Sequence, residues 1–161
     1  NPWQGTTQKE VEELILKNVI QLVKNEGQPK EGVTESLNLI KRLGYRLALA
    51  SSSGMVLINP VLDKLQIRDY FEVIHSAEFE KYGKPHPNIY LTTAKQLDLS
   101  PAFCIAIEDS INGIISAKAA KMKCIAIPEK DKINDKRLGI ADVVLSSLSE
   151  IDKDTIRALS K

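Results

Sequence analysis

The sequence is short of the features that mark secreted, membrane-spanning and nucleic-acid-binding proteins. Its 161 residues include only two cysteines, and no apolar run approaches the roughly 20 residues that span a bilayer. The start carries no signal-peptide pattern. The formal net charge is +1, so charge alone indicates neither a nucleic acid nor a membrane as a partner. We therefore expect a cytoplasmic protein in which Cys104 and Cys124, both inside apolar runs, are reduced core thiols.

What the chain does contain is a regular alternation of helical and strand-like segments after Gly32. The length suits one domain with a proper core. Near-continuous apolar runs predict strands at 46–51, 71–74, 103–107, 124–127 and 143–145. Apolar spacing and flanking Gly, Pro and Ser residues predict helices at 34–43, 55–66, 87–97 and 110–121. This order is typical of an α/β fold, a Rossmann-like parallel sheet with helices on both faces.

The first 26 residues are a separate helical segment. Apolar residues between Val11 and Val23 recur at helical spacing, and Thr6 or Thr7 offers an oxygen that can cap the helix. The Gly and Pro of residues 26–29 predict a linker after it. We interpret Trp3, the single tryptophan, as packing within this segment. The sequence thus divides at the linker, into residues 1–26 and 29–161.

Polar side chains gather where predicted strands end. Three serines follow one strand, a lysine lies in a later loop, and two carboxylates close another strand: Ser51, Ser52, Ser53, Lys84, Glu108 and Asp109. Ligands of parallel sheets bind beyond the carboxyl ends of the strands. Hydroxyls and amides at a helix start suit an anion, and adjacent carboxylates suit Mg²⁺ together with water and a phosphate. The set fits a site for a phosphoryl group beside a divalent cation.

Each of these residues also has a simpler interpretation. Ser53 can merely cap the next helix, and so can Asp109 or Ser110. An isolated lysine such as Lys84 is most often a solvated surface charge. Gly113 permits a close backbone approach, or it is a packing glycine.

Three other polar features are interpreted as structural. The two histidines, His75 and His86, are expected to have structural or solvent-facing roles, although His86 lies near Lys84. Asp152 and Asp154 form an Asp-x-Asp pair, but they follow Ser149 rather than an apolar strand. We therefore expect a polar helix start there and no catalytic pair.

The order of the motifs resembles that of a known family. Leu49-Ala-Ser-Ser-Ser53, Lys84-Pro-His-Pro87 and Glu108-Asp-Ser-Ile-Asn-Gly113 resemble motifs two, three and four of the haloacid dehalogenase-like hydrolase superfamily. The resemblance covers essentially the whole chain and is closest to the branch with a small helical cap that acts on sugar phosphates. It implies that residues 1–26 are the C-terminal part of the cap and that 29–161 are most of the α/β core.

The resemblance also implies a role for each site residue. Ser51 binds the transferring phosphoryl group, with Ser52 and Ser53 beside it, and Lys84 offsets its negative charge. Asp109 holds Mg²⁺, with Glu108 assisting directly or through water. The expected activity is Mg²⁺-dependent hydrolysis of a hexose or deoxyhexose 6-phosphate through an aspartyl-phosphate, in a parent protein that is a monomer.

One part of the family pattern is absent from this chain. The family nucleophile and acid/base are an Asp-x-Asp pair on an opening strand, and neither Asp is present. We expect a fragment that lacks its first strand, has no turnover, and can self-associate. The alternatives are a phosphomutase on the same scaffold and a non-catalytic phosphate-binding protein.

Two structural expectations follow from the resemblance. The absent strand is central in the family, between the strands at 46–51 and 103–107, so its loss leaves two half-sheets. Because unpaired edges are costly, we expect the inner edges to be covered by a retained segment, by a partner chain or by each other. Pro60 should kink the helix after the serines or delay its start to about Asn59.

Overall fold

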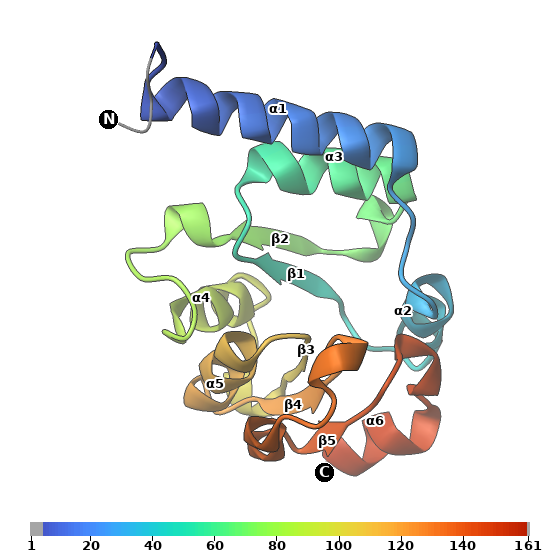
Figure 1. Cartoon of the computed structure of the whole chain (residues 1–161). Helices are drawn as coiled ribbons and strands as arrows, with labels where there is room; N and C mark the ends of the chain where they lie inside the picture. Colours follow the sequence, from blue (N-terminus) through green and yellow to red (C-terminus); the bar gives the residue numbers. More distant parts are fainter. Residues whose placement is uncertain (1–4, 161) are drawn as a thin grey trace.

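The computed structural model describes residues 5–160, and its strands form two parallel sheets rather than one (Figure 1). The first sheet pairs β1 (Ala48–Ser51) with β2 (Val73–Ser76), in a register that places Ser51 beside Ser76. The second has the order β3-β4-β5, with bounds Ile105–Glu108, Lys123–Ala126 and Val143–Val144. The predicted α/β class is confirmed.

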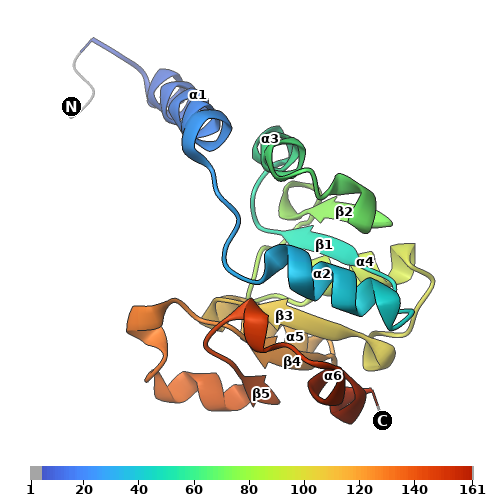
Figure 2. The same cartoon turned by 90° about the vertical axis from the view of Figure 1, so that its right-hand side faces the viewer.

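Within residues 5–160, six α-helices surround the strands. Their bounds are Gln8–Glu26 (α1), Val33–Arg42 (α2), Met55–Leu65 (α3), Asn88–Gln96 (α4), Ile111–Ala119 (α5) and Lys153–Leu159 (α6). Helices α4 and α5 cover one face, while α2 and α6 pack together with β4 and β5 on the other (Figure 2). Helix α3 lies beyond β2, and α1 packs on α3 (Figure 1). None of the described helices combines the length and apolar character needed to cross a membrane.

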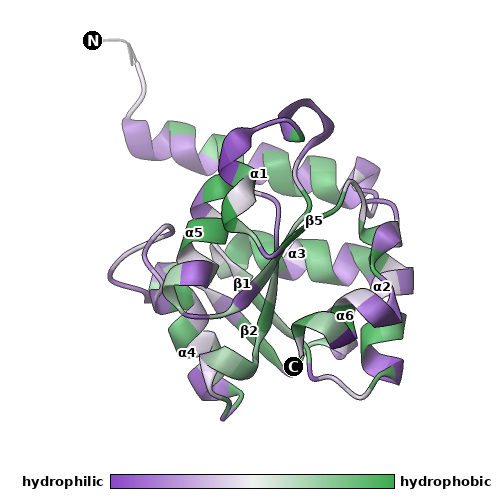
Figure 3. Cartoon of the chain, turned by 90° about the horizontal axis from the view of Figure 1, so that it is seen from below, coloured by the Kyte–Doolittle hydropathy of each residue, from purple (hydrophilic) through white to green (hydrophobic). Residues whose placement is uncertain are grey.

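Two apolar clusters form the core, one on each face. The cluster under α4 and α5 includes Ile89, Ile114 and Cys124, all fully buried. The other joins Ile125 of β4 to Ile156 of α6. In Figure 3 the central strands are hydrophobic, and hydrophilic residues gather on the outer loops. Both cysteines are free thiols, as predicted, and burial raises the pKa of Cys124 to about 12.

Local capping signals in the sequence set most helix ends. Thr7 and Glu10 form a reciprocal capping box at the start of α1. Gly44, with φ of 82°, follows the C-cap of α2 in the left-handed region, as expected. The Asp152 carboxylate accepts a 2.7 Å hydrogen bond from the Thr155 amide, which confirms a polar helix start there. The predicted helices therefore exist, with ends shifted by one or two residues.

The start of α2 is fixed by a close backbone approach. Gly32 has φ of 83°, and a Cβ at this position would lie 2.2 Å from the backbone nitrogen of Ser149. Any side chain at position 32 would therefore clash with the backbone of Leu148 and Ser149. This contact ties the beginning of α2 to the turn before α6.

Three sequence expectations need correction or fall outside the structure. Helix α3 begins at Met55 and includes Pro60, so the late start near Asn59 is wrong. The carbonyl that Pro60 cannot bond belongs to Val56, which is 54% exposed and can be solvated instead. Phe103 is 84% exposed and belongs to a 3₁₀ turn, so β3 begins two residues later than predicted. Trp3 lies outside the described residues.

A gap separates the two sheets. Within residues 5–160, β1 pairs only with β2, and β3 pairs only with β4. Ile107 of β3 is 38% exposed and Leu49 of β1 is half-buried, although strands covered on both faces normally bury such residues. The expected half-sheets are confirmed, whereas pairing of the two inner edges with each other is wrong. The other two ways of covering the edges stay predictions.

Candidate active site

The gap opens into a groove at the carboxyl ends of β1 and β3. The groove has a volume of about 940 Å³. All six predicted site residues line it: Ser51, Ser52, Ser53, Lys84, Glu108 and Asp109. Because the strands of both sheets run parallel, residues that end β1 and β3 meet at one edge although 57 positions separate Ser51 from Glu108.

Lys84 and Glu108 form a buried ion pair in this groove. The Lys84 ammonium contacts Glu108 Oε1, and the side chains are 11% and 5% exposed. The ammonium also donates to the Ala50 carbonyl at 3.4 Å, so it lies at the end of β1. The interpretation of Lys84 as a solvated surface charge is therefore wrong. A charge this buried needs its partner, because removing one member leaves the other unpaired.

The serine loop presents hydroxyls and backbone amides. Ser51 Oγ accepts a 3.1 Å hydrogen bond from the Ser53 amide, and the Ser53 carbonyl accepts one of 2.8 Å from Ser76. Ser52 is exposed to the groove. Gly54, not Ser53, is the N-cap of α3, so capping does not explain the serines. Glu78 instead accepts a hydrogen bond from the Met55 amide, at 3.1 Å.

Asp109 is an exposed carboxylate of the groove and follows β3 directly. Among residues 5–160 its carboxylate has no hydrogen-bond or ion-pair partner, and Ser110 rather than Asp109 caps α5. No three His, Cys, Asp or Glu side chains of the described part of the chain gather into a metal-binding cluster. Mg²⁺ is commonly held by one or two carboxylates, waters and a phosphate, so Asp109 with Glu108 nearby fits that ion.

Gly113 provides the space that the Glu108 side chain occupies. A Cβ on Gly113 would lie 1.7 Å from Glu108 Oε2, so the expected close approach is to a side chain, within the site itself. Gly113 is therefore more than a packing glycine, because the side chain that it accommodates belongs to the site.

Replacing Gly113 by Ala is therefore expected to displace Glu108 and separate it from Lys84. Loss of a buried pair's geometry should cost roughly 2–4 kcal/mol of the free energy of unfolding, measured by urea denaturation. Gly139→Ala is the matched control, because a Cβ there has no atom within 4 Å. Equal stability of the two variants would contradict this role of Gly113.

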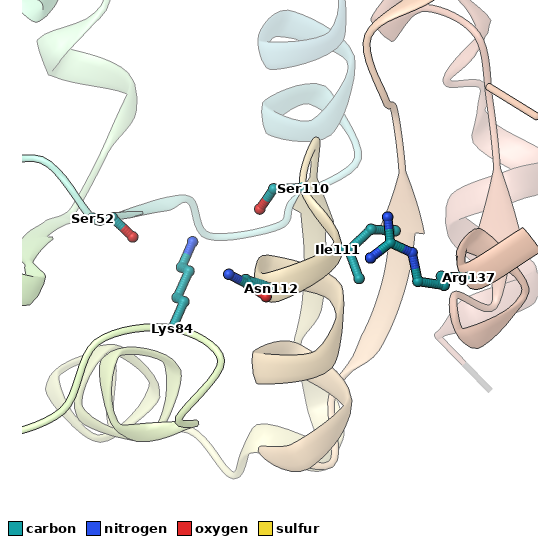
Figure 4. Close-up of a pocket in the computed structure, with 6 residues that line it drawn as sticks. All are labelled: Ser52, Lys84, Ser110, Ile111, Asn112 and Arg137. Atoms are coloured by element: carbon teal, nitrogen blue, oxygen red, sulfur yellow. The ribbon is translucent and has the colours of Figure 1, made fainter. Parts of the chain in front are cut away.

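A smaller pocket of about 380 Å³ adjoins the groove, and sequence reasoning had not assigned three of its residues: Ile111, Asn112 and Arg137 (Figure 4). The Lys84 ammonium points toward the space between Ser52 and Asn112, whereas Arg137 lies beyond Ile111. Arg137 donates to Asp135 at 2.6 Å and lowers the pKa of that carboxyl to about 2, so Arg137 already has an anionic partner. Asn112 lies inside the stretch Glu108–Gly113 that resembles motif four, but the motif pattern assigned it no role of its own.

Neither histidine belongs to the groove lining. His75 is buried and pairs with Glu80 at 2.8 Å. The backbone carbonyl of His86 accepts a 2.8 Å hydrogen bond from Ser116, and its ring is exposed beside Tyr82. A hydrogen bond from Thr92, followed by the effect of His75, lowers the pKa of Glu80 despite its burial. These contacts support the structural interpretation of both histidines.

Comparison with known proteins adds independent support. A family profile described as a haloacid dehalogenase-like hydrolase matches residues 3–121. Hexitol phosphatase B of Escherichia coli is 41% identical over 150 residues, which cover 93% of this chain and 68% of that protein.

Solved structures give the same result. CbbY from Rhodobacter sphaeroides in complex with phosphate matches with a TM-score of 0.80 at 27% identity, over 91% of this chain and 66% of the other. β-Phosphoglucomutase from Clostridium difficile matches with a TM-score of 0.79 at 29% identity, over 94% and 64%. The chain thus spans about two thirds of these relatives, and with the family profile, the fold and the motif order in agreement, it belongs to the haloacid dehalogenase-like hydrolase family.

Proposed function

We propose that this chain is part of a Mg²⁺-dependent phosphatase of small sugar phosphates, of the hexose or deoxyhexose 6-phosphate type. The observation that carries the proposal is the convergence of the serine loop, the Lys84 ammonium and the Asp109 carboxylate on one groove. The similarity to hexitol phosphatase B supports the substrate class.

In this proposal each described residue has a chemical task. The Ser51 hydroxyl and the groove-facing Ser52 bind the phosphoryl oxygens, as polar groups before a helix start do. Lys84 offsets the negative charge that these oxygens carry in the transition state. Asp109 would hold Mg²⁺, and Glu108, which faces Lys84, would assist it directly or through water. Mg²⁺ would supply positive charge next to the transferring group.

In this proposal the nucleophile comes from outside the described residues. Asp152 is the first residue of the Asp-x-Asp pair in this chain. Its carboxylate caps α6, and it does not line the groove. We propose that an upstream strand ending in Asp-x-Asp fills the gap and forms an aspartyl-phosphate, which divides the reaction into two easier displacements.

The same proposal assigns the two units of the chain. Residues 1–26 are the C-terminal part of a helical cap, and 29–161 are the α/β core without its first strand. Helix α1 packs on α3 and leaves Leu14, Ile15 and Leu22 more than half exposed, which fits a helix whose other face is covered by the rest of a cap. The cap would close over the groove and exclude water.

A phosphomutase is the second candidate, because β-phosphoglucomutase has the same fold at 29% identity. Both activities use one core and differ in whether the cap lets water or a second sugar hydroxyl take the phosphoryl group. A panel of hexose monophosphates assayed for free phosphate and for isomerised product separates the two.

The direct test is hydrolysis by a longer protein that includes the upstream strand. We expect phosphate release from hexose or deoxyhexose 6-phosphates with Mg²⁺, and its loss after a chelator is added. The 161-residue chain, verified by mass, should show no turnover above background. Hydrolysis by that chain alone would mean that the nucleophile is misassigned, and a longer protein inactive on every phosphate ester would favour a non-catalytic phosphate-binding role.

A further inference from the structure

Tyr90 lies beneath the Lys84–Glu108 pair and contacts both members. Its hydroxyl donates to Glu108 Oε1 and accepts from the Lys84 ammonium at 3.4 Å. The same ammonium lies 5.0 Å from the centre of the Tyr90 ring. Lys84, Tyr90 and Glu108 therefore form a closed triangle of contacts, and Tyr90 is the only neutral member.

The tyrosine is itself held firmly. It is 8% exposed and belongs to the apolar cluster between α4 and α5. Its hydroxyl lies against the Glu108 carboxylate, and because a carboxylate only accepts hydrogen bonds, the hydroxyl is the donor of this contact. A rigid donor is what a buried carboxylate needs, because each unsatisfied lone pair there is costly.

We propose that Tyr90 is a positioning residue that holds the Glu108 carboxylate against Lys84 and, through it, fixes the ammonium at the carboxyl end of β1. Gly113 leaves the space on one side of the carboxylate, and the Tyr90 hydroxyl holds it on the other. Tyr90 does not line the groove, so it acts through its two neighbours. The contribution of Tyr90 to catalysis rests on the proposed function, whereas its effect on the position of Lys84 does not.

The experiment measures the rate at which Lys84 is acetylated by limiting acetic anhydride in the metal-free 161-residue chain, by peptide mass spectrometry. An amine held by a carboxylate and covered by a ring reacts slowly. We expect Tyr90→Phe to raise the rate about fivefold or more, because the loss of a hydrogen bond to a charged group frees the carboxylate and then the ammonium. Glu108→Gln should raise it at least as much.

A double variant decides whether Tyr90 acts through Glu108. If it does, Tyr90→Phe adds no further increase in the Glu108→Gln background, because interacting residues are not additive. Tyr70→Phe is the matched control, since Tyr70 also donates a hydrogen bond, to Asn38 at 2.9 Å, and lies under a lysine, Lys41, at 5.4 Å. This control should leave the Lys84 rate unchanged.

Two outcomes would overturn the proposal. One is an unchanged Lys84 rate in folded Tyr90→Phe, and the other is independent, multiplying effects in the double variant. Far-UV circular dichroism shows whether Tyr90→Phe folds. If it does not, the NMR chemical shift of the Tyr90 ¹³Cζ atom is measured instead, in variants that keep the tyrosine. That shift should change in Glu108→Gln and not in Asp109→Asn, and an unchanged shift in Glu108→Gln would equally overturn the proposal. Neither measurement uses substrate or metal. Their results therefore do not depend on whether the proposed phosphatase activity is correct.

Discussion

Asp109→Asn and Lys84→Ala are each expected to lower kcat/KM of the longer protein by roughly 100-fold or more, about 2.7 kcal/mol of transition-state stabilisation. Asp109 is an exposed carboxylate of the groove at the end of β3, and the amide that replaces it lacks the charge that a divalent cation needs. Without Lys84 the phosphoryl charge is no longer offset, and Glu108 is left buried and unpaired.

Steady-state kinetics on a hexose 6-phosphate measures this effect. Asp69→Asn and Lys95→Ala are suitable controls, because both residues are exposed and neither lines the groove. They should retain activity within a factor of about two, as surface substitutions usually do. Full activity of both Asp109→Asn and Lys84→Ala would remove the basis of the proposed site.

Ile107→Lys is expected to destabilise two forms of the protein to very different extents. In the 161-residue chain Ile107 is already 38% exposed, so a charge there should cost less than about 1 kcal/mol of the free energy of unfolding. It should also reduce self-association, since a lysine on an edge strand discourages pairing with another chain. In the longer protein the upstream strand should bury this position, and the same substitution should cost about 3 kcal/mol or more.

Urea denaturation and analytical ultracentrifugation of both forms, each with and without the substitution, provide the measurement. The unpaired edges of β1 and β3 matter because each buried unpaired group costs about 1–3 kcal/mol, against a typical domain stability of 5–15 kcal/mol. Backbone hydrogen exchange of β1 and β3 should slow in the longer protein. A stable monomeric 161-residue chain with equally slow exchange would show that the strand is dispensable.

The sequence was most informative where structure is decided by neighbouring residues. The sequence narrowed the cap of α1 to Thr6 or Thr7 and that of α5 to Asp109 or Ser110, because capping depends on residues close in the chain, and the structure gives Thr7 and Ser110. The alternation of helices and apolar strands was enough for the α/β class. The motif order placed the serines, Lys84 and the carboxylates on one groove, which the structure brings together.

The features that were missed depend on contacts between distant residues. Helix α3 runs from Met55 to Leu65 with Pro60 inside it, although a proline normally interrupts a helix. Phe103 resembles a strand residue by type, yet the turn at Pro101 places it outside β3. The contacts of Tyr90 with Lys84 and Glu108 join positions 6 and 18 residues apart, and no periodic pattern marks them.

The close approach of Gly32 to Ser149 also determines where the chain can bend. The start of α2 cannot turn away from the core without breaking that contact, so it acts as a fixed anchor. Any reorientation of α1 relative to the strands must then be taken up by residues 27–31, where Lys30 forms an exposed ion pair with Glu129 at the rim of the groove. The pivot between the two units is therefore a five-residue segment held to the core by a salt-sensitive ion pair, and higher ionic strength would loosen it. The packing of α1 on α3 must also yield before the helix can reorient.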